Sequence, residues 1–190
     1  KMKLIELALT MAYDAKVNYE DVFYQVRMWD TIIYNYLKRR NIVIPPKERS
    51  DKAEKYAGAY VKEPIPGKYD WVVSFDLNSL YPHLIMQYNI SPETIINSQS
   101  DLKIDKLLDK KYNLSKLKDN NIAIAANGTM YKTDKQGFLP EMLEKEYNDR
   151  VKYKKLMIQA QQEYQQTKNK KLLNDIAKYH IIQFSKKISL

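Results

Sequence analysis

The stretch Val72-Val73-Ser74-Phe75-Asp76-Leu77-Asn78-Ser79-Leu80-Tyr81-Pro82 joins a strand signal to a helix start. The β-branched and aromatic residues from Val72 to Phe75 predict a strand. Asp76 follows this run at once, and Pro82 suits the first turn of a helix. The order therefore predicts a carboxylate at a strand end, with backbone N–H groups just beyond it. In such a place a metal ion can meet a phosphate group.

Two helices are expected before this stretch. Residues 2–13 place apolar side chains on one side, and residues 19–39 keep a 3.6-residue period with Asn18 in position to cap the helix. Alternation and β-branching return in Ala59-Tyr60-Val61 and in residues 71–75, on either side of Pro64-Ile65-Pro66-Gly67. We expect a strand, a turn and a second strand there.

Beyond the opening stretch, Leu80 to Tyr88 is expected to be a helix. Residues 97–121 are rich in Lys, Asp and Asn and are expected to form a surface insertion with a short amphipathic helix. Residues 122–126 and 129–132 flank Asn127-Gly128. That dipeptide between two apolar runs predicts a β-hairpin with a two-residue turn.

The last third of the chain predicts two long helices. Pro140 suits the first turn of a helix that runs to about Gln166, and a second helix carries apolar residues from Leu173 to Ile188. Only a short polar turn separates the two helices, so they should lie antiparallel. The chain is thus expected to have an α+β fold, with N-terminal helices, a partial β-sheet with a hairpin, and a long helical hairpin.

Composition narrows the class of protein. The 190 residues carry a net charge of +9, and residues 136–190 hold eleven Lys and Arg against six Asp and Glu. This balance favours a polyanionic partner, although lysines often only keep a surface solvated. The absence of cysteine excludes disulfides and thiolate metal sites, and two histidines make a histidine-based zinc site a poor fit. No apolar run approaches the roughly 20 residues that span a bilayer.

A second set of charged residues lies on the first long helix. Arg150 and Lys154 are four residues apart and share one helical face, where like charges repel by a few tenths of a kcal/mol. The pair is useful if an anion binds between the two side chains, with a guanidinium fork and an ammonium point charge for phosphate oxygens. A solvated basic face is the alternative. Antiparallel helices would also bring Lys187 near Arg150.

These residues resemble known motifs. Asp76 to Pro82 has the form D-x-x-S-L-Y-P, which resembles the first polymerase motif of family B DNA polymerases, and SFDLNSLYPHLIMQYNISPETI is similar to the T-even-type phage replicative enzymes. Residues 147–154 resemble the first helix of the family's fingers, and residues 186–190 resemble the second. Residues 56–60 resemble the family's Y-x-G-G/A element. His83 departs from the family, which usually has Ser there.

The resemblance implies roles for residues in each motif. Asp76 would be the catalytic carboxylate and a metal ligand, together with the backbone carbonyl of Leu77. Amides near Ser79 and Leu80 would face the phosphates, and Tyr81 would lie under the sugar and exclude a 2′-hydroxyl. The remaining positions are nucleotide-binding Arg150, Lys154 and Lys187, and DNA-binding Tyr56, Gly58 and Ala59.

The resemblance further implies a DNA-directed DNA polymerase that uses two Mg²⁺ ions to join a dNTP to a primer 3′-hydroxyl. The expected domains are 1–48, the end of the exonuclease region; 49–136, a partial palm; and 137–190, the fingers. The chain lacks an initiator Met and ends inside an apolar-periodic segment, so we expect a fragment that is inactive alone, because the second catalytic carboxylate motif is absent.

The expected partners are primer-template DNA, dNTP and the remainder of the polymerase chain, with no membrane. A sliding clamp reached through absent regions is left open. A phage-encoded enzyme would act in the cytoplasm of its bacterial host. Two alternatives stay open: a non-catalytic basic helical module that binds nucleic acid, and a metal-dependent nuclease that uses Asp76 with Glu63 or Asp70.

Overall fold

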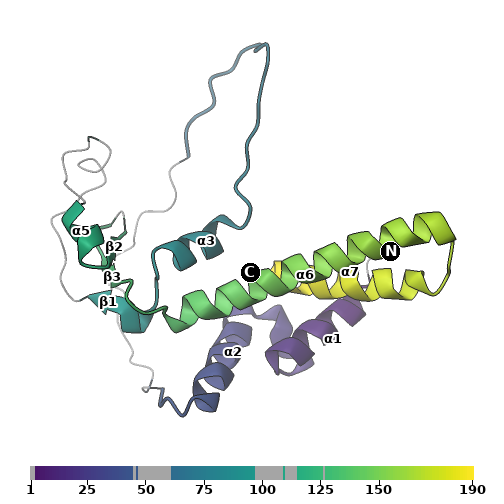
Figure 1. Ribbon diagram of the computed structural model, residues 1–190, viewed down its shortest axis with the longest axis horizontal. Coiled ribbons are helices and arrows are strands. Elements are labelled where there is room, and N and C mark those ends of the chain that lie inside the picture. The colour runs from purple at the N-terminus through teal and green to yellow at the C-terminus, as the bar shows by residue number, and fades with distance from the viewer. Residues whose placement is uncertain (1–2, 45, 47–60, 97–108, 110–114, 126) are drawn as a thin grey trace.

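The computed structural model describes residues 3–44, 46, 61–96, 109, 115–125 and 127–190 (Figure 1). It has an α+β fold, as the sequence predicts. The elements in chain order are α1 (Leu4–Ala15), η1 (Tyr19–Phe23), α2 (Gln25–Arg39), α3 (Leu80–Gln87), η2 (Pro92–Thr94), β1 (Ile95–Ile96), α5 (Ser115–Asp119), β2 (Ile122–Ile124), β3 (Met130–Lys132), α6 (Phe138–Thr167) and α7 (Leu172–Ser189).

The N-terminal helices enclose a small apolar core. Small residues of α1 and Met11 pack with Val22 of η1 and Met28 of α2, which is only 1% exposed. The expected single helix over 19–39 is wrong, because Tyr24 is extended and splits it into η1 and α2, and Asn18 makes no side-chain cap bond. In one unbroken helix, side chains six residues apart would point roughly 120° away from each other. The break at Tyr24 lets Val22 and Met28 reach the same core.

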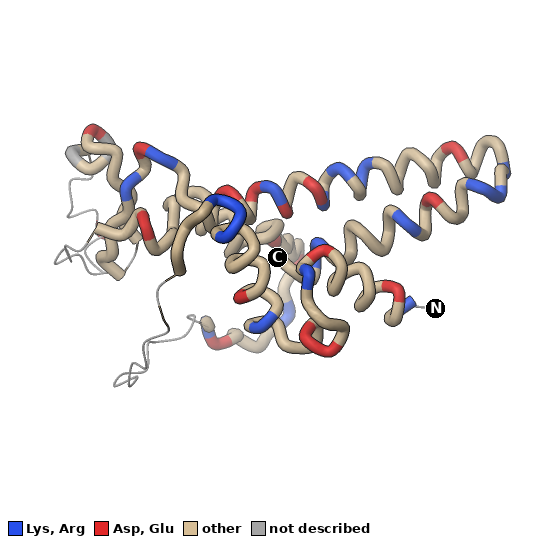
Figure 2. The backbone as a smooth tube through the Cα atoms, turned by 90° about the horizontal axis from the view of Figure 1, so that it is seen from below, with Lys and Arg blue, Asp and Glu red and all other residues tan. Residues whose placement is uncertain are grey.

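The helical hairpin is confirmed. α6 and α7 run side by side and antiparallel along the long axis of the molecule (Figure 1). Lys168 ends α6 in the left-handed conformation, with φ 54° and its N–H on the carbonyl of Tyr164. Figure 2 shows basic positions along both helices, with acidic positions among them. The positive charge of this third of the chain is therefore spread along the hairpin.

The end of α7 is fastened to the N-terminal helices and to α6. Trp29 donates its indole N–H to the carbonyl of Ser189 at 3.2 Å. The Lys186 ammonium lies 3.0 Å from Glu146 and 3.3 Å from Asp14, and its side chain is 12% exposed. Burial alone would lower the pKa of Lys186, but the two carboxylates outweigh it, so the pKa lies above the ordinary 10.5. A partly buried ion triad thus joins α1, α6 and α7.

The described strands form one small antiparallel sheet in the order β1-β3-β2. β2 and β3 confirm the predicted hairpin, with Ile124 opposite Met130. Its turn is longer than the expected two residues: the Ala125 amide donates to the Thr129 carbonyl, and the Gly128 amide donates to the Ala125 carbonyl. Gly128 has φ 86°, which favours glycine. The short strand β1 was not predicted from the sequence.

Asn89, which follows α3, connects α3 to β3 and to the start of α6. Its side-chain amide donates to the carbonyls of Lys132 and Lys135 at 2.6 and 2.8 Å, and its side-chain oxygen accepts from the Gly137 amide at 2.8 Å. The residue is buried and has φ 54°, which Asn tolerates better than most residues. These bonds fix the position of β3 and of the start of α6 relative to α3.

The N-terminus of α6 is capped by residues from another element. Glu93 accepts the Phe138 amide at 2.6 Å, and the Ser91 hydroxyl accepts the Leu139 amide at 3.4 Å. A carboxylate also suits the positive end of the helix dipole. A Cβ on Gly137 would lie 2.6 Å from the Cβ of Ser91, which is closer than side chains approach. Glycine therefore permits this close contact.

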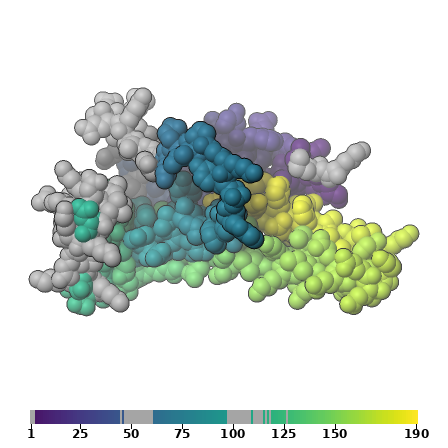
Figure 3. Space-filling model, turned by 90° about the horizontal axis from the view of Figure 1, so that it is seen from above, coloured from purple at the N-terminus to yellow at the C-terminus, as the bar shows by residue number. Residues whose placement is uncertain are grey.

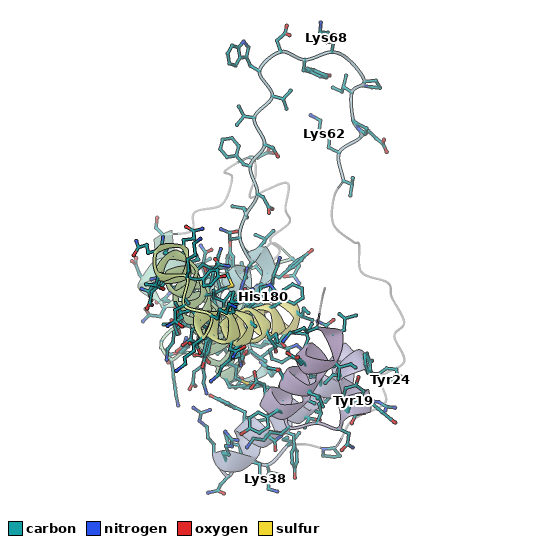
Figure 4. The ribbon with its side chains drawn as sticks, turned by 90° about the vertical axis from the view of Figure 1, so that its right-hand side faces the viewer. Tyr19, Tyr24, Lys38, Lys62, Lys68 and His180 are labelled. Carbon is teal, nitrogen blue, oxygen red and sulfur yellow. The ribbon has the colours of Figure 1, made fainter. Side chains whose placement is uncertain are left out.

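The strand predicted over 71–75 is not formed. Residues 61–78 form a loop that projects from the helices, with Lys68 near its tip and Lys62 on one limb (Figures 1 and 4). Trp71 has φ 60° and is 98% exposed, and Phe75 is 92% exposed. A strand needs a hydrogen-bonded neighbour, and within the described residues the sheet contains only β1, β2 and β3. High β-propensity alone does not order this segment.

Some predictions fall outside the described residues. The DNA-binding candidates Tyr56, Gly58 and Ala59 lie there, as do most of the expected strand over 59–61 and the amphipathic helix in 97–108. The helix over residues 80–88 is confirmed as α3. Among the described helices, none has the length and apolarity to cross a bilayer.

Candidate functional site

The N-terminus of α3 presents free backbone donors. Ser79 precedes the helix in the left-handed conformation, with φ 52° and ψ 51°, and its side chain makes no cap bond. The first-turn amides of Leu80 and Tyr81 have no acceptor within the helix. Pro82 occupies a first-turn position where its missing N–H costs no hydrogen bond. This end of α3 is suited to an anion, since both the amides and the helix dipole favour negative charge.

Arg150 of α6 reaches this turn. Its Nη1 donates to the Ser79 hydroxyl at 3.0 Å, although the two residues are 71 positions apart in the sequence. α3 packs against α6, and Figure 3 shows the teal surface of α3 beside green α6. The structure therefore brings together two groups that the sequence marked separately, the turn after Asp76 and the basic face of α6.

The other candidate cations lie on nearby turns. Lys154 is exposed and follows Arg150 by one helical turn, which is about 6 Å along the axis. Lys187 is exposed on the last turn of α7, whereas the neighbouring Lys186 is held by its two carboxylates. The bond between Lys186 and Glu146 places the end of α7 beside the turn of α6 that precedes Arg150. The end of α7 thus lies beside this part of α6, while the approach of Lys187 itself to Arg150 stays a prediction.

Asp76 and Leu77 lie three and two residues before Ser79, at the base of the projecting loop. Asp76 is exposed, and Leu77 is 69% exposed. The Asp76 carboxylate and the Leu77 carbonyl are hard oxygen donors of the kind that Mg²⁺ prefers. These two groups are the ones here that would hold such an ion. Across the described residues, no three acidic or histidine side chains gather into a group that could hold a metal ion.

Tyr81 is 73% exposed, so it does not pack in the core of the described structure. Its position directly after Leu80 keeps it beside the first-turn amides.

Sequence reasoning missed the part that His83 plays. Its Nδ1 lies 2.9 Å from the Ser79 carbonyl oxygen, which also accepts the His83 backbone amide at 3.2 Å. The ring meets Tyr147 edge-on, with centroids 4.7 Å apart and planes at 82°. Two signals in the sequence could have pointed to this role. His83 follows Ser79 by four residues, which is one helical turn, and it stands where the family usually has Ser.

Comparisons with known proteins agree with the geometry. Residues 24–178 match DNA polymerase family B. The chain is 42% identical over 161 residues to the DNA-directed DNA polymerase of Escherichia phage RB69, an alignment covering 85% of this chain and 17% of that protein. It is 35% identical over 153 residues to the DNA-directed DNA polymerase of Enterobacteria phage T4, covering 80% and 17%.

Similarity extends beyond phages. The chain is 33% identical over 123 residues to DNA polymerase 1 of Pyrococcus abyssi, covering 62% of this chain and 14% of that protein. The chain thus spans about a sixth of the length of the phage relatives, with 17% of each aligned. The match to the family covers most of the chain, including α3 and the start of α7. This chain belongs to DNA polymerase family B.

Proposed function

We propose that this chain supplies the triphosphate-binding half of a DNA polymerase active site. Its nucleotide site comprises the first-turn amides of α3 and the basic side chains of the helical hairpin. The parent reaction is the attack of a primer 3′-hydroxyl on the α-phosphate of a dNTP, with pyrophosphate as the leaving group. Membership of the family supports this reaction class.

The observation that carries the proposal is the bond from Arg150 to Ser79 at 3.0 Å. It aligns a guanidinium with a helix N-terminus, so that both can act on one anion. Phosphate oxygens can accept from the amides of Leu80 and Tyr81 and from the free N–H groups of Arg150. Lys154 and Lys187 add mobile positive charge at the edge of this site.

The metal-binding part rests on Asp76 and the carbonyl of Leu77. In the complete site, Mg²⁺ would bind there and neutralise charge on the transferring phosphate. This chain would hold the triphosphate beside one set of metal ligands, the Asp76 carboxylate and the Leu77 carbonyl. Tyr81, beside the amides, would then lie under the sugar and discriminate against a 2′-hydroxyl.

A single carboxylate does not complete a two-metal site, so we propose that the chain alone binds Mg²⁺–dNTP but does not extend a primer. The test has two measurements on the same preparation: equilibrium titration with Mg²⁺–dNTP, and primer extension with radiolabelled primer-template. Saturable binding without extension is expected. Absence of binding at millimolar nucleotide, or measurable extension, would each contradict one half of the proposal.

The substitution Asp76→Ala tests how much of the dNTP binding depends on Mg²⁺. We expect it to weaken Mg²⁺-dependent dNTP binding and to leave binding without Mg²⁺ unchanged. Asp70→Ala is the matched control, because Asp70 lies on the same exposed loop and serves no purpose in the proposed site. Equal effects of the two substitutions would show that general loop charge, rather than Asp76, governs binding.

The same variants discriminate the alternatives. A basic module that binds nucleic acid without catalysis would bind DNA equally well after Asp76→Ala and would show no magnesium-dependent nucleotide binding. A nuclease using Asp76 with Glu63 or Asp70 would cleave DNA in Mg²⁺. It would lose cleavage after Asp76→Ala, and after Asp70→Ala only if Asp70 is the second carboxylate. The polymerase proposal expects neither cleavage nor a change in DNA affinity.

A further inference from the structure

We infer that His83 is a positioning residue for the proposed nucleotide site: its Nδ1–H holds the Ser79 carbonyl and thereby fixes the turn that aims the first-turn amides of α3. The inference rests on the proposed function for its effect on nucleotide binding. Its structural half stands on the geometry of the Ser79 turn alone.

The hydrogen bond determines the tautomer of His83. The Ser79 carbonyl oxygen can only accept, so the Nδ1 atom 2.9 Å away must carry the proton and donate. The same oxygen accepts the His83 backbone amide at 3.2 Å. Both lone pairs of this carbonyl are thus used by one residue. That oxygen belongs to the residue that holds the unfavourable left-handed conformation, with φ 52°.

A second set of contacts ties this turn to α6. The face of α6 that carries Tyr147 and Arg150 presents two groups to α3: Tyr147 meets the ring of His83, with centroids 4.7 Å apart, and Arg150 donates to the Ser79 hydroxyl. The two contacts are three residues apart on α6 and four apart on α3. Both contacts link α6 to the start of α3. The bond from Nδ1 to the Ser79 carbonyl connects the residue in the first contact, His83, to the residue in the second, Ser79.

The consequence concerns the orientation of the Ser79 turn. A rotation of the Ser79–Leu80 peptide would move the Leu80 amide away from the site and would break both hydrogen bonds from His83 to the Ser79 carbonyl. The hydrogen bond from the His83 ring opposes this rotation, and the edge-on contact with Tyr147 holds the ring in place. His83 touches none of the groups that would meet a nucleotide, so its effect passes through Ser79.

Two substitutions separate the donor from the ring. His83→Phe keeps an aromatic ring for Tyr147 and removes the donor. His83→Ser removes the ring but can donate to the carbonyl four residues back, a common bond for Ser in a helix. His180→Phe is the matched control, since His180 stacks on Phe184 of α7, 5.8 Å between centroids, and makes the same chemical change elsewhere.

For Mg²⁺–dNTP titration, His83→Phe should weaken binding about fivefold, the equivalent of one net hydrogen bond of roughly 1 kcal/mol. His83→Ser and His180→Phe should stay within about twofold of the unsubstituted chain, since each keeps the donor at Ser79. Loss of affinity in His83→Ser with normal affinity in His83→Phe would overturn the inference, because ring packing and not the donor would then matter.

Nuclear magnetic resonance tests the structural half without nucleotide. With only two histidines in the chain, ¹⁵N spectra resolve each ring, and His83 should be the Nδ1–H tautomer. The amide peaks of Leu80 and Tyr81 should shift in His83→Phe and remain in place in His83→Ser. An Nε2–H tautomer would overturn the inference. If the unsubstituted chain binds no nucleotide but the tautomer is as expected, the proposed function fails and the positioning of the turn stands.

Discussion

Lys186 offers a strong test of how the hairpin is fastened to the rest of the molecule. We expect Lys186→Met to lower the free energy of unfolding by about 2 kcal/mol. Methionine has a similar length and suits the partly apolar surroundings, so the change mainly removes the charge. It leaves the carboxylates of Glu146 and Asp14 facing each other without the cation between them.

The magnitude follows from distance and burial. At an effective dielectric constant of about 20, a cation 3.0 Å from Glu146 gains roughly 5 kcal/mol before desolvation is counted. Removing one partner of a fully buried pair costs roughly 3–5 kcal/mol. The side chains of Asp14 and Glu146 keep 34% and 24% exposure, so water relieves part of the loss. This exposure reduces the expected cost to about 2 kcal/mol.

The assay is urea unfolding followed by tryptophan fluorescence. Trp29 bonds to Ser189 at the end of α7 and reports on this region, while the 98% exposed Trp71 is removed by Trp71→Phe in every variant. A loss of 2 kcal/mol corresponds to roughly 4–8 °C in melting temperature for a chain of this size.

Lys187→Met is the matched control. This neighbouring lysine is exposed, and its substitution should stay within about 0.5 kcal/mol. Adding Asp14→Asn and Glu146→Gln to Lys186→Met should recover part of the loss, because the repelling charges are then gone. Equal stability of the Lys186 and Lys187 variants would refute the argument that this ion triad fastens α7.

Three further outcomes are expected. Gly137→Ala should lower the free energy of unfolding by about 2 kcal/mol, because its Cβ would overpack against Ser91; the same unfolding assay measures this. Gly67→Ala, where the loop has room, should be neutral. Equal costs for the two substitutions would contradict the close contact at Gly137. Asn89→Ala should cost about 2–3 kcal/mol, since one buried and two part-buried backbone groups lose their partner. Slowed amide exchange at Gly137 should disappear. The stability difference between the unsubstituted chain and Lys186→Met should be constant between pH 7 and about pH 10. It should shrink as pH rises through the raised pKa of Lys186, because the cation then loses its proton in the folded state. A difference that shrinks on acidification from about pH 9 to 7 would contradict the assignment.

The helices were predictable from sequence because periodicity is a local signal. The stripe from Leu173 to Ile188 and the proline at 140 gave both members of the hairpin and their antiparallel order. The loop over 71–75 shows the limit of local reasoning. Its β-propensity is high, but strand formation depends on a neighbour, and that information does not lie in the segment itself.

The candidate site was partly predictable for a similar reason. Asp76 and Arg150 each lie in a recognisable sequence pattern, so both could be named in advance. Their meeting at Ser79 depends on the packing of α3 on α6, which no local pattern encodes. Asn89 and His83 escaped prediction because their bonds reach distant or unremarkable backbone carbonyls. For both residues, the amino-acid type gives no signal, and the role becomes visible only from the hydrogen bonds in the folded structure.

The capped start of α6 would be the pivot if this helix tilted. Glu93 and Gly137 fix one end of a helix of 30 residues, which is roughly 45 Å long. A tilt of about 0.1 radian about that end would move the far tip about 4.5 Å but Arg150 only about 2 Å, since Arg150 lies roughly 20 Å from the pivot. A given tilt would therefore displace the hairpin tip more than twice as far as it displaces Arg150. Changes in sequence or length near the turn after Thr167 should be far better tolerated than any change at the pivot.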